Sequence, residues 1–239
     1  SEDMITIYLL TYNESLLISH TIAFYRERHP GCRIILHDNC SDDGTVEIAK
    51  ALGCEVISFD TEGKLSDARY LFIKNHCWKG ALSTWVIVGD CDEWLDITAQ
   101  QLREEERKGV TAIKGEGWNM VNQENDCEIA AIKHGYRNEE VSTFYDKVLL
   151  FNRFKIKNIN YNIGAHGCRP TGQVKYGYGY KMYHMKYISP DYMVAKYKRY
   201  AERMSDQNRQ KSWGGQYLHS EQAIRAEFEG ARLMSKKIR

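Results

Sequence analysis

Short apolar runs alternate with amphipathic segments over roughly the first hundred residues. The runs are rich in Ile, Val and Leu and have the length of buried strands. The segments between them carry apolar residues on one helical face, as Ile18, Ile22 and Tyr25 illustrate. This alternation predicts a largely parallel sheet with helices on both faces. The predicted strands are 5–10, 33–37, 55–59 and 85–88, and the predicted helices are 15–28, from the turn at 39–44 to 52, and 66–79.

The second half of the chain has a less regular pattern. A helix is predicted from the N-cap Ser189, with Pro190 in its first turn, to about residue 204. Trp213-Gly214-Gly215 separates it from a last helix and is a candidate lid. We predict an α/β fold with a mostly parallel central sheet flanked by helices and a smaller antiparallel extension. The other predicted elements are strands at 110–114, 147–151 and 181–187, the last two as antiparallel additions, and a helix at 220–236.

Length and composition restrict the class of protein. The 239 residues are enough for one sizeable α/β domain, which we divide into halves at 4–97 and 98–239. The formal net charge of +1 gives no reason to expect nucleic acid as a partner. No apolar run approaches the ~20 residues of a transmembrane segment. The seven cysteines are scattered without a Cys-x-x-Cys pair, so we expect no zinc ribbon or disulfide framework, and a cytoplasmic location.

The strongest chemical signal is Asp90-Cys91-Asp92, directly after the apolar strand at 85–88. In open parallel sheets, ligands bind beyond the carboxyl ends of the strands. Two carboxylates there can share Mg²⁺ or Mn²⁺, which prefer oxygen ligands, and the cation can neutralise a departing diphosphate. The alternative is a solvated acidic turn, because Asp-x-Asp triplets are common. The position after a buried strand favours the metal site.

Two polar clusters follow the first and second predicted strands, at the same edge of the sheet as the carboxylates. They are Thr11-Tyr12-Asn13-Glu14 and the segment 38–45. Asp38 can accept the imide N–H of uracil, and Thr11 can bond a base carbonyl. Other residues of the second cluster can instead cap the helix that follows. A calcium loop is excluded, because Lys50 stands where the bidentate Glu is required.

Two basic residues precede the carboxylate strand. Arg69 lies at the start of the helix that opens with Asp67-Ala68-Arg69, and Lys64 comes just before it. Both side chains can donate charge-assisted hydrogen bonds to a diphosphate. Ordinary surface basicity is the alternative, and for Lys64 it explains the residue equally well.

Together these motifs resemble family 2 glycosyltransferases of the GT-A fold. The resemblance covers roughly the first hundred residues, in matching order and spacing: 11–14, 38–45, 67–69 with Asn75, and 90–93. It implies that the 4–97 half binds a nucleotide sugar and the 98–239 half an acceptor. By resemblance, Thr11, Asn13, Glu14 and Asp38 hold the nucleoside, Arg69 lies near base or phosphate, Asp90 faces ribose or metal, and Asp92 ligates the metal. The predicted donor site also includes Asn39, Cys91 and Lys64.

The later part of the chain resembles members of this fold that have a metal-ligand histidine near the end. His184, in the predicted strand at 181–187, fits that role. His166 lies in a Gly-rich loop and can contact the donor or acceptor sugar. For each histidine the alternative is a packed or surface side chain.

One feature of the family is not evident. The Glu-Asp pair that opens a late helix, and supplies the base in inverting members, is missing, so the stereochemical outcome stays open. A base must reach the acceptor hydroxyl at hydrogen-bond range. The candidates are Glu116 and Asp146, with Asp126 behind them, and each can equally be a structural or surface acid. Asp92 completes the predicted catalytic set through the metal.

The aromatic and the basic residues of the second half each have a functional and a structural interpretation. Aromatic faces pack against sugar rings, so the aromatic set below can form an acceptor platform, or it can reflect alternation on a half-exposed strand. The basic tail at 236–239 can touch an anionic membrane surface, or it is a solvated helix end. The aromatic set comprises Trp118, Tyr176, Tyr178, Tyr180 and Tyr183.

The sequence therefore predicts a glycosyltransferase that depends on Mn²⁺ or Mg²⁺ and passes a sugar from a UDP-sugar to a glycan or lipid-linked glycan. A sugar nucleotidyltransferase would need a Gly-rich basic loop after the first strand, and 11–14 offers none. A dinucleotide-dependent oxidoreductase is disfavoured because Gly115-x-Gly117 and Gly177-x-Gly179 lack the third glycine. An inactive carbohydrate-binding module would not need both carboxylates of 90–92.

Overall fold

The structure of the chain is a computed structural model. It describes residues 5–64, 66–137, 145–204, 210–211, 215 and 219–239. The candidate lid at Trp213 and Gly214 lies outside the described residues. Within the described part, no helix combines the length and apolar character that crossing a bilayer requires.

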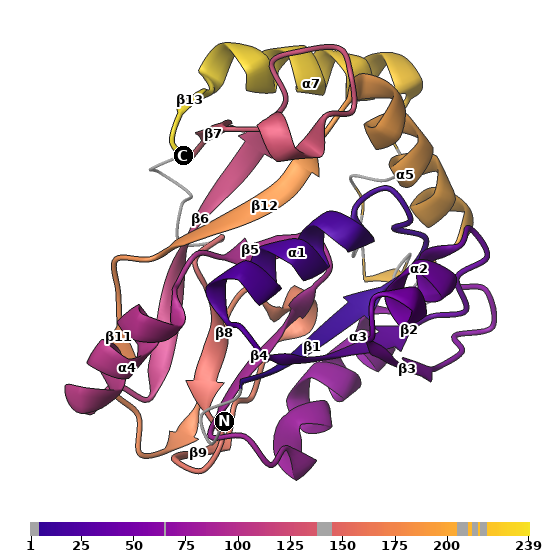
Figure 1. The fold of residues 1–239 in the computed structure, drawn as a ribbon. Helices are drawn as coiled ribbons and strands as arrows, with labels where there is room; N and C mark the ends of the chain where they lie inside the picture. Colours follow the sequence, from indigo (N-terminus) through magenta and orange to yellow (C-terminus); the bar gives the residue numbers. More distant parts are fainter. Residues whose placement is uncertain (1–4, 65, 138–144, 205–209, 212–214, 216–218) are drawn as a thin grey trace.

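Four parallel strands form the first half of the sheet, as predicted (Figure 1). Leu10 pairs with Asp90 and Thr11 with Asp38, so the carboxyl ends of the three strands that carry these residues meet at one edge. The spatial order is β4-β1-β2-β3. The strands are β1 (Thr6–Thr11), β2 (Arg33–Asp38), β3 (Glu55–Ser58) and β4 (Trp85–Asp90).

Helices cover both faces of this parallel part, because side chains of opposite parity along each strand point to opposite faces. Ile7 and Leu9 of β1 pack in the core that includes α1 and α2. Tyr8, between them, packs instead with Trp78 on the other face. The helices are α1 (Ile18–Arg28), α2 (Thr45–Ala51), α3 (Asp67–His76) and the 3₁₀ turn η1 (Cys77–Gly80).

The second half turns the sheet into a mixed one. β8 (Lys147–Asn152) runs antiparallel between β4 and β6 (Ala112–Val121), as predicted for an antiparallel addition. β12 (Lys181–Tyr187) runs parallel to β6 and antiparallel to β5 (Glu93–Leu95). The sequence predicted β12 as an antiparallel addition, and this is true of its pairing with β5 but not of its pairing with β6. The main path of the sheet is β13-β7-β6-β8-β4-β1-β2-β3.

Several features of this half differ from the sequence prediction, including the end of the predicted helix at 220–236, where Lys236 belongs to a short strand. β6 is longer than the predicted strand at 110–114 and continues through Gly115 and Gly117. These glycines allow neighbouring segments to come close instead of forming a turn. A Cβ on Gly117 would lie 2.2 Å from the Tyr145 carbonyl oxygen. β5 was not predicted, since three residues show no periodicity. Helix α4 (Ala99–Arg107) was not predicted either, although Thr98 and Gln101 form a capping box at its start.

Two helices pack together at the end of the molecule that carries the C-terminus (Figure 1). α5 (Pro190–Glu202) begins as predicted, with Ser189 accepting a hydrogen bond from the Tyr192 amide. α7 (Glu221–Met234) packs Phe228 against Tyr187 of β12. The remaining short elements are η2 (Ile129–Ala131), β7 (His134–Tyr136), β9 (Ile156–Asn158), η4 (Ile163–Ala165), β10 (Thr171–Gly172), β11 (Tyr176–Gly177) and β13 (Lys236–Lys237).

We predict that His29 makes the stability of the fold depend on pH. It is 3% exposed at the end of α1, and burial, only partly offset by a hydrogen bond with the Ile97 backbone, lowers its pKa to about 4. The unfolded chain takes up this proton near pH 6.5, so the free energy of unfolding should fall as pH drops from about 6.5 to about 4, by up to about 1.4 kcal/mol per pH unit.

Chemical denaturation of the wild type and His29→Gln across this pH range measures the effect. The variant should lose this component of the pH dependence, whereas His76→Gln, at an exposed position, should retain it. An unchanged pH slope in His29→Gln would contradict the prediction.

Candidate active site

The Asp90–Asp92 turn is fixed by backbone bonds to two neighbouring strands. The Cys91 amide donates to the Leu10 carbonyl at 3.2 Å, and the Met185 amide donates to the Asp92 carbonyl at 2.8 Å. From the side of α1, the Thr21 hydroxyl donates to the Cys91 carbonyl at 2.7 Å. Both aspartates are therefore held at the meeting point of β1, β4 and β12.

Lysines from separate elements neutralise the charge of the carboxylates at this turn. Lys74 of α3 lies 2.9 Å from Asp90, and Lys147 of β8 lies 2.5 Å from Glu93. Burial would raise the pKa of Glu93, but Lys147 and Lys74 lower it to about 2. The other Glu93 oxygen accepts a hydrogen bond from the Asp90 amide at 2.8 Å. Glu93 is thus committed to holding the turn and was not predicted from the sequence.

His184 faces Asp92 at the end of β4. Its Nδ1 lies 3.0 Å from the Asn119 side-chain oxygen, to which it donates. Its Nε2 lies 3.2 Å from Asp92 Oδ2. A proton or a metal ion can bridge an imidazole nitrogen and a carboxylate oxygen placed in this way.

The donor set at this turn fits a divalent metal. One carboxylate oxygen from each of Asp90, Asp92 and Glu93 lies within 4.8 Å of the others, and of these three Asp90 and Asp92 are the candidate ligands because both Glu93 oxygens are engaged in holding the turn. Burial would raise the pKa of Asp92, yet Lys196 and His184 hold it well below its ordinary value, so the carboxylate is ionised. Oxygen ligands with one imidazole nitrogen suit Mn²⁺, and oxygen alone suits Mg²⁺.

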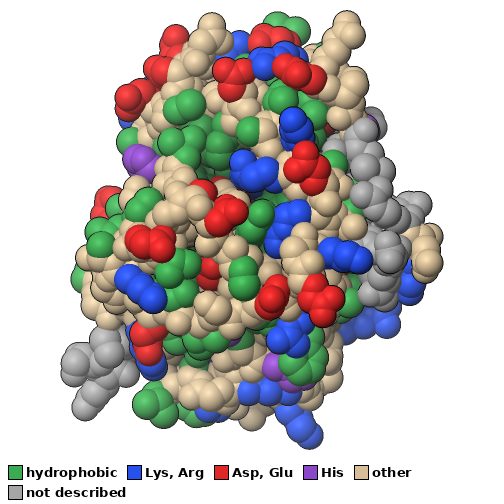
Figure 2. Space-filling model, turned by 90° about the vertical axis from the view of Figure 1, so that its right-hand side faces the viewer, with side chains coloured by type: hydrophobic (Ala, Val, Ile, Leu, Met, Phe, Trp, Pro, Cys, Tyr) green, Lys and Arg blue, Asp and Glu red, His purple; other side chains and the backbone are tan. Residues whose placement is uncertain are grey.

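A cavity of about 570 Å³ opens above the turn. Figure 2 views the molecule from the side on which α5 lies, and shows acidic and basic side chains next to one another over this face. The structure brings together seven predicted residues in the cavity wall: Thr11, Glu14, Asp90, Cys91, Asp92, His166 and His184. Sequence reasoning missed other lining residues, among them Tyr12, Tyr70, Tyr145, Lys147, Lys186, Lys196, Tyr197, Tyr200 and Glu227.

At the nucleoside end, Thr11 and Asp38 lie in different surroundings. The Thr11 hydroxyl lines the cavity and is buried with no hydrogen-bond partner among the described residues. Asp38 is 1% exposed, accepts hydrogen bonds from the Ser41 amide and hydroxyl, and is not part of the cavity wall. Asn39 is likewise engaged inside the protein, donating to the hydroxyls of Thr61 and Tyr70.

Asn13 and Glu14 also have partners within the protein. Asn13 has a left-handed backbone conformation, and its amide group exchanges two hydrogen bonds of 2.9 Å with Asp42. Glu14 lines the cavity but is nearly buried, with Tyr192 donating to one oxygen at 2.6 Å and Lys196 lying 2.7 Å from the other. Asn13 therefore shapes the loop, whereas Glu14 anchors α5 over the cavity.

Helix α5 supplies a basic face that sequence reasoning missed. Lys196, Arg199 and Arg203 recur at the spacing of one helical face, which was the available signal. Arg199 donates to the Asn13 carbonyl at 3.2 Å, and the Arg203 guanidinium lies 3.1 Å from the Tyr12 ring centre. Arg199 Nε and Arg203 Nη1 are buried and have no hydrogen-bond partner in the described part of the chain.

The two predicted basic residues before β4 lie outside the cavity wall. Lys64 and Arg69 are both exposed, and the Arg69 guanidinium lies 6.0 Å from the Phe72 ring centre. Asn75 of the same motif is structural, since its side-chain oxygen accepts a hydrogen bond from the Tyr161 amide at 2.7 Å.

The predicted bases are placed apart from the carboxylate pair. Glu116 accepts a hydrogen bond from the Trp118 indole at 2.8 Å and does not line the cavity. Asp146 is paired with Arg137 and accepts from the Gly117 amide at 2.9 Å. Asp126 is exposed on a loop. All three carboxylates thus have partners or positions away from the cavity.

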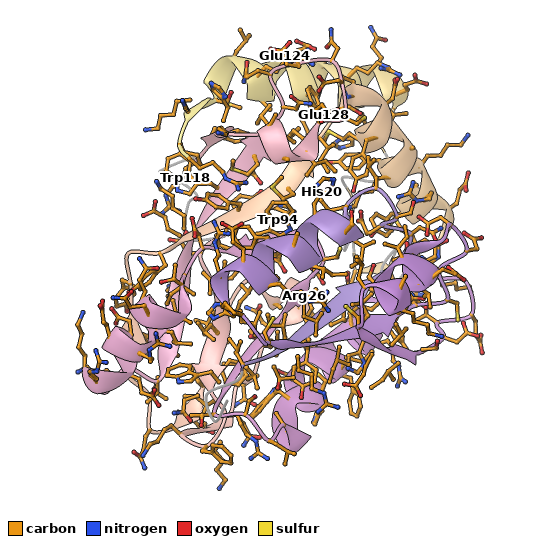
Figure 3. The ribbon with its side chains drawn as sticks, viewed as in Figure 1. His20, Arg26, Trp94, Trp118, Glu124 and Glu128 are labelled. Atoms are coloured by element: carbon orange, nitrogen blue, oxygen red, sulfur yellow. The ribbon has the colours of Figure 1, made fainter. Side chains whose placement is uncertain are left out.

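The predicted aromatic platform does not line the cavity. Trp118 and Tyr183 are buried, and Tyr178 is 64% exposed. Figure 3 shows Trp118 on the opposite side of the molecule from α5. Trp118 instead lines a separate hollow with Lys181 and the basic segment 236–239.

The chain matches one protein family. Residues 6–111 match the model of the family described as Glycosyl transferase family 2. This matched segment is a family 2 glycosyltransferase domain. Family 2 glycosyltransferases are enzymes that use nucleotide sugars, and the α/β sheet of the structure agrees with the predicted GT-A fold. Comparison with curated protein sequences gives no significant match.

Two solved structures illustrate what the chain is similar to. S. aureus TarS residues 1–349, solved with UDP-GlcNAc, is 13% identical, with 95% of this chain and 71% of TarS covered and a TM-score of 0.42. Glucosyl-3-phosphoglycerate synthase from Mycobacterium tuberculosis, solved with Mn²⁺, UDP and glucosyl-3-phosphoglycerate, is 15% identical, with 69% of this chain and 62% of that chain covered and a TM-score of 0.42.

We predict that the Lys147–Glu93 pair is essential to the stability of the fold. Lys147→Met leaves the Glu93 carboxylate buried without its closest cation, which should lower the free energy of unfolding by about 3–5 kcal/mol. The double variant Lys147→Met/Glu93→Gln removes both charges and should recover at least half of that loss.

Urea denaturation of the variants measures this. The exposed pair Arg33–Glu55 provides the control, and Arg33→Met should cost less than about 1 kcal/mol. A Lys147→Met protein as stable as the wild type would show that Glu93 is held by other means.

Proposed function

We propose that this domain transfers a hexose-type sugar from a UDP-sugar to a hydroxyl of a glycan or lipid-linked glycan, using Mn²⁺ or Mg²⁺. The observation that carries the proposal is the approach of Asp92 Oδ2 and His184 Nε2 to 3.2 Å at the end of β4. Asp92 and His184 would hold the cation, with Asp90 beside them. A bound cation supplies charge that stabilises the departing nucleoside diphosphate. The imidazole favours Mn²⁺ over Mg²⁺.

The donor would lie across the ends of β1 and β4, beneath α5. The unpartnered Thr11 hydroxyl suits a hydrogen bond to a uracil carbonyl, and the aromatic ring of Tyr12 lies in the same wall. Arg199 and Arg203 lie outside the cavity wall, and their buried, unpartnered N–H groups would suit phosphate oxygens if the donor reached them. We keep the division into a donor half at 4–97 and an acceptor half at 98–239 as part of this proposal. In this arrangement α5, from the second half, would cover the donor bound by the first half.

Glu227 of α7 is the carboxylate that we propose as the base. It lines the cavity and accepts a hydrogen bond from the Tyr197 hydroxyl at 3.2 Å. The carboxylates of the Asp90–Glu93 turn are instead held by lysines. Burial lowers the pKa of Lys186, two residues past His184, and the Glu227 carboxylate partly offsets this. Glu227 and the carboxylates of the turn line the same cavity.

We predict that Asp92→Asn abolishes metal-dependent turnover. With water as the acceptor, release of UDP from UDP-sugars in the presence of Mn²⁺ should fall on the order of 100-fold, because charge stabilisation of the leaving group is lost. Circular dichroism checks that the fold is intact, and Asp191→Asn, at an exposed position of α5, is the control. Full activity of Asp92→Asn would remove this carboxylate from the site.

We also predict which of three carboxylates acts as base. Glu227→Gln should lower the turnover rate by about 10²–10⁴-fold and leave the dissociation constant for the UDP-sugar within threefold, roughly, because a base acts in the transition state. Glu116→Gln and Asp146→Asn test the two candidates from the sequence, and Glu229→Gln, an exposed position on the same helix, is the control. Unchanged turnover in Glu227→Gln, with a loss in either other variant, would assign the base there.

A further inference from the structure

Lys196 of α5 lies between two nearly buried carboxylates. Its Nζ is 2.7 Å from Glu14 Oε1 and 3.3 Å from Asp92 Oδ2. The side chains of Lys196, Glu14 and Asp92 are 12%, 4% and 15% exposed. Asp92 Oδ2 is also the atom that His184 Nε2 approaches at 3.2 Å. One carboxylate oxygen therefore meets the lysine and the histidine at the same time.

The ammonium group of Lys196 already supplies positive charge where a divalent cation would bind. A metal ion bound to Asp92 and His184 would be only a few Å from this ammonium, among largely buried charged side chains, where like charges repel strongly. The two cations therefore compete for Asp92 Oδ2. Lys74 and Lys147 do not enter this competition directly, because their ion pairs are with Asp90 and Glu93.

Lys196 has a position to which it can withdraw. Glu14 is its closer partner, and Tyr192 fixes the second Glu14 oxygen at 2.6 Å. The rings of Tyr192 and Tyr200 have their centres 5.7 Å and 5.8 Å from Lys196 Nζ, at the range of cation–π attraction. The ammonium group can thus leave Asp92 and remain stabilised by Glu14 and the two rings.

We propose that Lys196 is a tethered competitor of the divalent metal, holding Asp92 Oδ2 while no metal is bound and yielding it to the metal by withdrawing to Glu14. The inference rests on the metal site of the proposed function. It assigns Lys196 a positioning role: the lysine keeps the charge of the site balanced before loading and weakens metal binding by the protein alone.

Electron paramagnetic resonance of Mn²⁺ tests this without donor or acceptor, because the signal of the free ion is lost on binding. Lys196→Gln, which can still hydrogen-bond to Glu14, should bind Mn²⁺ about tenfold more tightly than the wild type, or better. Lys196→Arg keeps the charge and should bind within threefold, roughly, of the wild type. Lys198→Gln, exposed on the same helix, is the matched control and should also be unchanged.

Equal or weaker Mn²⁺ binding by folded Lys196→Gln would overturn the inference. If Lys196→Gln does not fold, Lys196→Met takes its place: tighter Mn²⁺ binding supports the competition, and unchanged or weaker binding overturns it. The double variant Asp92→Asn/Lys196→Gln separates this failure from that of the proposed function. Tight Mn²⁺ binding that survives Asp92→Asn would place the metal elsewhere and refute both, whereas loss of binding in the double variant supports the site.

Discussion

The balance of charge at the end of β4 is the constraint on which the rest of the structure depends. The nearly buried carboxylates of Asp92 and Glu93 would be costly without cations close to them. The cations come from different parts of the chain, with Lys147 on β8 and Lys196 on α5. Each ion pair therefore connects the turn after β4 to an element far away in the sequence. The same contacts that stabilise the fold also hold the Asp-x-Asp turn ready for a ligand.

The sequence was sufficient for the parallel part of the sheet and for the meeting of Asp92 with His184. Apolar runs such as 85–88 define buried strands, and the ends of parallel strands share one edge, so chemistry placed there converges. The family motifs then located the histidine. By contrast, β5 is too short to show a period, and β6 continues through glycines that indicate a loop when the sequence is considered alone.

The lysines of the site could not be predicted for a different reason. Lys74 and Lys196 sit in amphipathic helices, where a lysine ordinarily points to water. Only the tertiary contacts with Asp90 and Asp92 bury them. Tertiary hydrogen bonds also could not be predicted for Asp38 and Asn13, whose residue types suit a nucleoside. In the structure Asp38 accepts hydrogen bonds from Ser41, and Asn13 donates one to Asp42.

The central claim is that a divalent cation binds between Asp92 and His184, in the cavity that α5 helps to line. The most direct measurement is anomalous X-ray diffraction at the manganese edge from crystals of the protein grown with Mn²⁺ and UDP. We predict a manganese peak in bonding contact with Asp92 and the Nε2 atom of His184. A peak at another place, or UDP bound with no manganese at this turn, would contradict the claim.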